Sequence, residues 1–354
     1  MRLEAILEGL DRREPAALAR AISLVENQRD GFERVLSHAH TRLGGARRIG
    51  ITGPPGAGKS TLTERLIQQF RAQALSVGVV AVDPTSPFTG GALLGDRIRM
   101  ESASLDPHVF IRSMATRGAH GGLATTTEEV ADLLEAFGFA RILVETVGVG
   151  QTELDIARSA ETTVLVLVPE SGDGIQTLKA GVMEIADVYV VNKSDRPGAD
   201  KLRQEVEVML GIRRGNAYAH TAPHHRLSDS GTVGQSDRRR LPSDRPTVRP
   251  ADAWEPPVLP TVASTGEGIA ELVAALERHH QYLQSSGTLA ERRRQRLAAR
   301  TRAALERGVR RWIAEATRAE ELLATRLDDV ASGRRSPYDV AAEILDQMKA
   351  EATR

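Results

Sequence analysis

One eight-residue segment constrains the fold of this chain more than any other: Gly53–Ser60, which reads GPPGAGKS. It fits the pattern G-x-x-x-x-G-K-[ST] at every fixed position, and it lies between an apolar run, Arg48–Thr52, and an amphipathic stretch, Ser60–Arg71. A glycine-rich loop between a β-strand and an α-helix directs backbone N–H groups at a phosphate, and the helix N-terminus adds its dipole. The sequence therefore predicts a phosphate-binding P-loop in an α/β domain.

The roles of single P-loop residues follow from the chemistry of a nucleoside triphosphate. The Lys59 ammonium would neutralise charge between the β- and γ-phosphates, the Ser60 hydroxyl would ligate Mg²⁺, and Thr61 would reach the α-phosphate. We expect the phosphates to be contacted by Gly53, Pro54, Pro55, Gly56, Ala57, Gly58, Lys59, Ser60 and Thr61.

After Arg47 short β-rich runs alternate with longer amphipathic stretches, which is typical of a mostly parallel central sheet flanked by helices. The expected strands are Arg48–Thr52, Val77–Val82, Val109–Ser113, Arg141–Glu145, Thr163–Val168, Val188–Val191 and Val258–Val262. The expected helices between them include Ser60–Arg71, Thr127–Phe137, Ile175–Ile185 and Gly268–Leu283.

The chain is expected to have three parts. Residues 1–46 read as an N-terminal helical extension, residues 47–286 as the P-loop domain, and residues 287–354 as a C-terminal helical arm. Within the domain, residues 211–254 have few aliphatic side chains and no periodicity, so we interpret them as a mobile or disordered insertion.

The C-terminal arm is expected to contain a long helix, Leu289–Arg326, and a second helix, Pro337–Lys349. The apolar side of the long helix would be better buried against a second copy of the chain than left in water. This predicts a homodimer, with contacts through Leu297, Leu305, Val309 and Ile313.

Acidic residues that could serve Mg²⁺ follow the P-loop. Glu145 ends an apolar strand three residues before Gly148, the Walker B arrangement, in which the carboxylate holds Mg²⁺ and the glycine N–H meets the γ-phosphate. Asp83 also ends a strand, where phosphate ligands bind in open α/β sheets, and Asp96 follows a glycine-rich stretch that could act as a switch loop. The expected Mg²⁺ ligands are Ser60, Asp83, Asp96 and Glu145.

The choice of base is indicated by Asn192-Lys193-Ser194-Asp195, which directly follows an apolar strand. The Asp195 carboxylate can accept hydrogen bonds from the ring N–H and the exocyclic amine of guanine, whereas adenine presents the wrong polarity. Lys193 would lie along the base, and Asn192 would join this loop to the P-loop. The expected fifth element is the strand end formed by Val262, Ala263 and Ser264, of which a backbone N–H would reach the guanine oxygen. The pattern favours GTP over ATP.

Composition excludes several other classes of protein. With 47 basic and 47 acidic residues and 3% aromatic residues, the chain lacks the basic field and stacking platforms of a nucleic-acid-binding protein. Because it has no cysteine, disulfides, thiolate metal sites and cysteine nucleophiles are excluded. No apolar run approaches the ~18 residues of a membrane span and no signal peptide is evident, so we expect a soluble, cytoplasmic protein.

Together the strings GPPGAGKST, LGDRIRM, ILVETVGVGQTE, ESGDGIQTLKAG and VNKSD resemble the MeaB/ArgK family of methylmalonyl-CoA-mutase-associated GTPases, from about Leu18 through Leu283. The resemblance implies a homodimeric GTPase that uses GTP, GDP and Mg²⁺ and acts as a chaperone of an adenosylcobalamin-dependent acyl-CoA mutase. Such a chaperone gates cofactor delivery and protects the mutase from inactivation. The resemblance also implies that Gln176 and Lys179 couple the nucleotide to the mutase.

The candidate catalytic residues are Lys59, Glu145 and Gln151. Small GTPases often place a water-orienting glutamine directly after the Walker B glycine, but here that position is Val149 and the nearest glutamine is Gln151. Phosphoryl transfer depends on positioning and charge stabilisation, so we expect slow intrinsic hydrolysis that the partner mutase accelerates.

Three other interpretations remain open at this level. They are a GTPase that inserts a metal into an enzyme, a P-loop kinase of a small metabolite or transport protein, and a structural protein with a vestigial nucleotide site. The absence of cysteine disfavours the first, and the NKSD motif disfavours a kinase that uses ATP.

Overall fold

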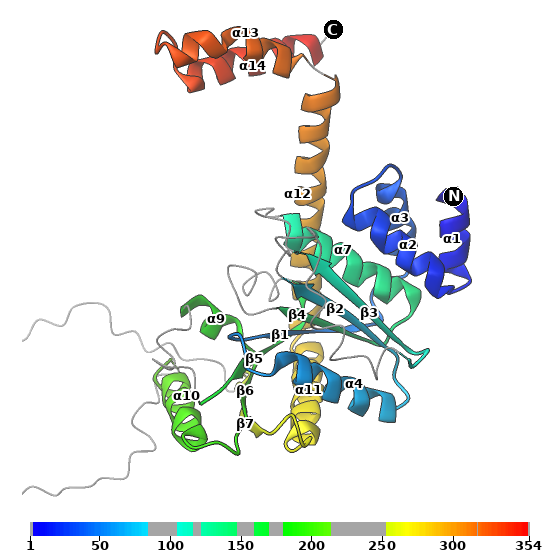
Figure 1. The fold of residues 1–354 in the computed structure, drawn as a ribbon, viewed down its shortest axis with the longest axis vertical. Coiled ribbons are helices and arrows are strands. Elements are labelled where there is room, and N and C mark those ends of the chain that lie inside the picture. Colours follow the sequence, from blue (N-terminus) through cyan, green and yellow to red (C-terminus); the bar gives the residue numbers. More distant parts are fainter. Residues whose placement is uncertain are drawn as a thin grey trace, which may run out of the picture. The chain divides into compact units, whose positions relative to one another are not determined.

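The computed structural model describes residues 3–83, 105–115, 122–146, 159–169, 180–213, 253–316 and 318–352. The chain forms two compact units, Met1–Ala290 and Glu291–Arg354. Figure 1 shows the helices and strands of both units.

The first unit is built on a seven-stranded sheet in the order β3-β2-β4-β1-β5-β6-β7. Every neighbouring pair of strands is parallel, so the predicted parallel α/β architecture is confirmed. The strand bounds lie within two residues of those expected from the sequence. They are β1 Arg47–Thr52, β2 Val77–Asp83, β3 Val109–Ala115, β4 Arg141–Thr146, β5 Thr162–Leu167, β6 Val188–Asn192 and β7 Val258–Thr261.

Helices cover both faces of the sheet, and this double burial explains why the strands are apolar on both sides. One face packs on α4 and α11. The other packs on α1, α2, α3 and α7 over β2 and β4, and on α9 and α10 over β5 and β6. The helices of this unit are α1 Leu3–Asp11, α2 Pro15–Glu26, α3 Phe32–His40, α4 Lys59–Ala72, α7 Gly122–Phe137, α9 Ala180–Ile185, α10 Ala199–Arg213 and α11 Ile269–Ser285.

The N-terminal helices belong to the same compact unit as the sheet. Leu18, Ile22 and Val25 of α2 have no exposed surface and pack in one cluster with Leu134 of α7 and Val144 of β4. The helical periodicity that predicts this extension therefore marks a face buried against the sheet layer.

The expected bounds of the insertion, 211–254, need correction at both ends. Helix α10 continues through Gly211 to Arg213, and its buried side chains recur every fourth residue at Leu202, Val206 and Leu210. Trp254 is part of the fold, because its indole N–H donates to the Asp187 carbonyl oxygen at 2.8 Å. Residues 214–252 lie outside the described residues.

The second unit contains most of α12 Thr288–Ala316 and all of α13 Ala319–Ala331 and α14 Pro337–Ala352. Helix α12 begins three residues before the unit boundary. The expectation of one continuous helix, Leu289–Arg326, is wrong, because α12 ends at Ala316. An ion pair joins α13 to α14, between Arg326 Nη2 and Glu343 Oε1 at 2.9 Å. None of the described helices is long and apolar enough to cross a membrane.

Candidate nucleotide site

The P-loop follows the carboxyl end of β1, and its backbone requires glycine at two close approaches. Gly53 has φ = 142°, and a Cβ there would lie 2.1 Å from the Val166 carbonyl oxygen of β5. Gly58 has φ = 85°, and a Cβ there would lie 2.4 Å from the side-chain nitrogen of Asn192. A side chain at either position would collide with its neighbour and strain the backbone. The fixed glycines of the motif therefore serve tertiary packing as well as phosphate access.

Lys59 begins α4 and is 94% buried, with its ammonium directed back at the loop. Its Nζ atom donates to the carbonyl oxygens of Gly53 and Pro54, both at 3.0 Å. The positive charge is thus held inside the curve of the P-loop, where it would meet the phosphates of a nucleotide.

Glu145 of β4 meets α4 through two hydroxyl groups. Ser60 Oγ donates to Glu145 Oε1 at 2.6 Å, and Thr63 Oγ1 lies 2.7 Å from Glu145 Oε2. The Glu145 side chain is 3% exposed, so this carboxylate is both buried and hydrogen-bonded. Hydroxyl and carboxylate oxygens are the donors that Mg²⁺ prefers, so Ser60 and Glu145 fit the cation expected here. The sequence predicts Ser60 and Glu145 but not Thr63.

Asn192, at the end of β6, joins three parts of the site. Its Nδ2 atom donates to the Ala57 carbonyl oxygen of the P-loop at 2.8 Å. Its Oδ1 atom accepts hydrogen bonds from the Thr261 hydroxyl and the Ala263 N–H, both at 3.1 Å. One buried amide thereby ties the P-loop to the loop that follows β7.

The other residues of this motif lie beside Asn192. Lys193 adopts a left-handed backbone conformation with φ = 56°, and the Ser194 N–H donates to the Thr261 carbonyl oxygen at 3.0 Å. Asp195 is exposed, which leaves its carboxylate accessible to a base.

Arg65 of α4 is a site residue that the sequence does not reveal. Its Nε atom donates to the Ala263 carbonyl oxygen at 2.9 Å, and its Nη2 atom donates to the Ser264 carbonyl oxygen. A helical arginine after a P-loop usually faces solvent, and no local pattern indicates these contacts.

Several predicted site residues are not placed. Gly148, Gln151, Asp96, Gln176 and Lys179 lie outside the described residues. Asp83 ends β2, as expected, but its side chain is not among those described. Within the described ranges, no group of three or more His, Cys, Asp or Glu side chains could hold a metal ion.

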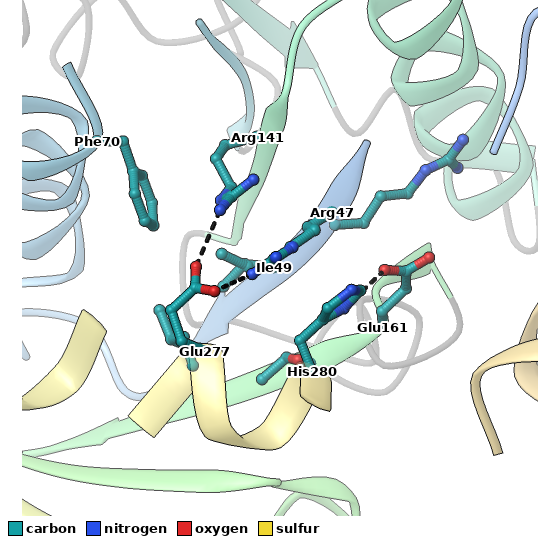
Figure 2. A pocket seen from close by; sticks show the side chains of 10 residues that line it. Arg47, Ile49, Phe70, Arg141, Glu161, Glu277 and His280 are labelled. Carbon is teal, nitrogen blue, oxygen red and sulfur yellow. Dashed lines mark hydrogen bonds and ion pairs between the residues drawn. The ribbon is translucent and has the colours of Figure 1, made fainter. Parts of the chain in front are cut away.

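A hollow lies where β1, β4 and β5 begin, at the opposite end of these strands from the P-loop (Figure 2). Both oxygens of Glu277, on α11, bind arginines there: one accepts from Arg47, and the other accepts from Arg141 at 2.9 Å. The Arg141 guanidinium also lies 5.5 Å from the ring centre of Phe70. Both arginines are already paired with Glu277, and these contacts hold α11 to the sheet. We therefore assign no ligand to this hollow.

Comparisons with known proteins agree with this geometry. A family model described as "Methylmalonyl Co-A mutase-associated GTPase MeaB" matches residues 18–318. A relative from Pyrococcus horikoshii, named as a GTPase, is 45% identical over 83% of this chain and 83% of its own length. GTPase ArgK of Escherichia coli is 33% identical over 80% of this chain and 77% of its own length.

The fold has a solved counterpart as well. The crystal structure of an LAO/AO transport system kinase has a TM-score of 0.63 and 26% identity, and the match covers 98% of this chain and 97% of that one. The parallel sheet, the P-loop and the relatives named as GTPases support GTP hydrolysis. The chain therefore belongs to the MeaB family of methylmalonyl-CoA-mutase-associated GTPases.

Proposed function

We propose that this GTPase is a chaperone of an adenosylcobalamin-dependent acyl-CoA mutase, which gates loading of the cofactor and protects the mutase. The observation that carries the proposal is the match to the MeaB family model over residues 18–318, because the description of that family names methylmalonyl-CoA mutase. The geometry supports a nucleotide-dependent switch, since Glu145 and Ser60 connect the sheet to the helix that begins at the P-loop.

Mg²⁺ is part of the proposal. Ser60 and Glu145 would hold it, with Asp83 and Asp96 as further carboxylates, and the cation would neutralise charge on the β- and γ-phosphates. Lys59 would add a second positive charge at the same phosphates. Ordering of segments by the γ-phosphate and Mg²⁺ is a known means of converting the nucleotide state into a change of surface shape.

Guanine specificity is assigned to Asp195, whose exposed carboxylate can accept two hydrogen bonds from the base. Gln151 would orient water, and Gln176 and Lys179 would transmit the nucleotide state to the mutase. Intrinsic hydrolysis is proposed to be slow and to be accelerated by the partner.

We also propose a homodimer held through the second unit. That unit exposes several large apolar side chains, and contact with a second copy would remove them from water. They include Leu305 at 67%, Val309 at 45%, Trp312 at 43% and Leu327 at 57% exposure.

Single-turnover GTP hydrolysis, measured with and without a purified acyl-CoA mutase, tests the central claim. We expect a faster rate with the mutase and a dependence of cofactor loading on GTP. An unchanged rate with every acyl-CoA mutase tested would contradict the chaperone role.

The kinase alternative is tested in the same reactions. It takes its support from the name of the solved counterpart, an LAO/AO transport system kinase. Radiolabelled γ-phosphate found only as inorganic phosphate would exclude a kinase, whereas label on a metabolite or protein would support one.

A further inference from the structure

The loop after β7 presents three backbone N–H groups on the side of the nucleotide site where the base is expected. They differ in whether another group of the protein already accepts their hydrogen bond. The Val262 N–H donates to the Glu267 carbonyl oxygen at 3.1 Å, and the Ala263 N–H donates to Asn192 Oδ1 at 3.1 Å. Within the described part of the chain the Ser264 N–H has no hydrogen-bond partner. Of the three amides, Ser264 is the one whose hydrogen bond remains available to a ligand.

The orientation of that amide is set by its neighbour in the same peptide unit. The Ala263 carbonyl and the Ser264 N–H belong to one planar trans peptide and therefore point in opposite directions. A donor that fixes the carbonyl oxygen fixes the direction of the N–H as well. The Ala263 carbonyl oxygen accepts a hydrogen bond from Arg65 Nε at 2.9 Å.

Arg65 binds this loop with two adjacent donors of one planar group. While Nε binds the Ala263 oxygen, Nη2 binds the oxygen of Ser264, the next residue. The remaining Nη1 atom donates to Gln68 Oε1 at 3.1 Å, one helical turn along α4. Nε and Nη2 bound to two successive carbonyl oxygens fix the plane of the guanidinium, and no single ammonium reproduces this fork.

We propose that Arg65 is a positioning residue for recognition of the 6-oxo group of a guanine nucleotide. It orients the Ser264 N–H, while Asn192 orients the preceding peptide through the Ala263 N–H. Because Arg65 and Lys59 share α4, one helix connects the phosphate end of the site with the base end. The proposal rests on the guanine site proposed above and adds a residue to it.

The test compares equilibrium binding of GDP, 6-thio-GDP and IDP to the full-length wild-type protein and to full-length R65A. In 6-thio-GDP a sulfur, a weak acceptor, replaces the guanine oxygen, while IDP keeps that oxygen and lacks the amine that Asp195 would read. We expect R65A to weaken GDP about 3- to 10-fold, the value of one oriented hydrogen bond, with a smaller loss for 6-thio-GDP. The ratio of GDP to IDP affinity should stay unchanged.

Two further variants control for folding. Gln68→Ala removes only the third contact of the guanidinium, on an exposed face of α4, and should bind all three nucleotides like wild type. Arg65→Lys keeps the charge and should lose most of the preference for GDP over 6-thio-GDP. If thermal melting shows that R65A does not fold, the affinities of R65K for GDP and 6-thio-GDP decide whether Arg65 has this positioning role.

The outcomes separate this proposal from the one on which it rests. Equal weakening of all three nucleotides, or an unchanged ratio of GDP to 6-thio-GDP affinity in both Arg65 variants, would overturn the role of Arg65. Wild-type protein that binds ADP as tightly as GDP would instead overturn the guanine site.

Discussion

The Ser60 hydroxyl donates a hydrogen bond to the Glu145 carboxylate across 2.6 Å, between residues 85 positions apart in the sequence. The contact connects the first turn of α4 with the end of β4, the two elements from which the Mg²⁺ ligands are expected. It brings a P-loop hydroxyl and a Walker B carboxylate within reach of one cation.

Glu145→Gln tests this relationship, because it keeps the shape of the side chain and removes its charge. We expect the Mg²⁺ concentration needed for half-maximal GTP hydrolysis to rise about 10- to 100-fold, as for loss of a metal-site carboxylate. Mg²⁺ titration of the single-turnover rate measures this. As a control, Thr63→Val removes one contact with the same carboxylate and should raise the requirement no more than about 5-fold. An unaltered requirement in E145Q would remove Glu145 from the metal site.

Lys59→Ala removes the buried ammonium that the Gly53 and Pro54 carbonyl oxygens hold inside the P-loop. We expect the rate of GTP hydrolysis to fall about 10²- to 10³-fold, because a preorganised positive charge at the transferred phosphate is lost. The matched control is Lys201→Ala on α10, whose side chain is 81% exposed. Equal rates for the two variants would indicate a vestigial nucleotide site.

Asp195→Asn should change the preferred base. Xanthine carries an oxygen where guanine carries its amine, and the Asn side chain offers an N–H donor where Asp offers only acceptors. We expect GTP affinity to fall about 10²-fold or more and XTP to bind more tightly than GTP. Competition binding with the two nucleotides measures this, and retention of GTP preference would show that another residue reads the base.

Glu135→Gln tests a buried charge cluster that holds β1 to α7. Arg48 donates to both Glu135 and Asp132, and Glu135 Oε1 also accepts from the Gly44 N–H at 2.5 Å. Breaking such a pair should cost about 3 kcal/mol of unfolding free energy. Thermal melting measures the loss, and Glu8→Gln, in an exposed pair with Arg12, should change it by less than about 0.5 kcal/mol. Similar melting temperatures for the two variants would contradict the role of this cluster.

The same carboxylate predicts how stability depends on pH. Burial alone would raise the pKa of Glu135, but the charge and hydrogen bonds of Arg48, with the N–H groups of Gly44 and Ala46, lower it overall. A folded-state pKa below the unfolded value stabilises the fold above the unfolded pKa, near 4.3, and this contribution is lost as pH falls through the folded value. Wild type should therefore lose stability on acidification below about pH 4.3 more steeply than E135Q. Parallel melting curves against pH would contradict this.

Leu305→Glu tests the proposed homodimer. Leu305 of α12 is 67% exposed in the single chain, and a carboxylate there would be costly to bury in an apolar interface. Light scattering after size-exclusion chromatography should give a monomer mass for L305E and a dimer mass for wild type. Leu105→Glu, at an 84% exposed leucine of the first unit, should leave the dimer intact. A dimer that survives L305E would place the interface elsewhere.

Elements with a strong local pattern could be predicted from the sequence. The strand β5 and the helix α4 lie within one residue of their expected bounds, because apolar runs and amphipathic periodicity reflect burial directly. No bounds are expected for α10, although its buried residues recur every fourth position, because the polar insertion is expected to begin at Gly211, inside this helix. The division between α12 and α13 also lacks a proline or glycine to indicate it.

The sequence by itself determined the fold class, the P-loop and the order of the nucleotide motifs, because each depends on residues within a few positions of one another. Only the tertiary structure decided that Thr63 contacts Glu145 and that Arg65 binds the loop after β7, 198 residues away. Such contacts have no sequence signature, because the local sequence around a helical threonine or arginine does not show whether its side chain faces water or the end of a strand. The parallel sheet brings these distant segments together at one edge, and their donors and acceptors then pair according to distance and direction alone.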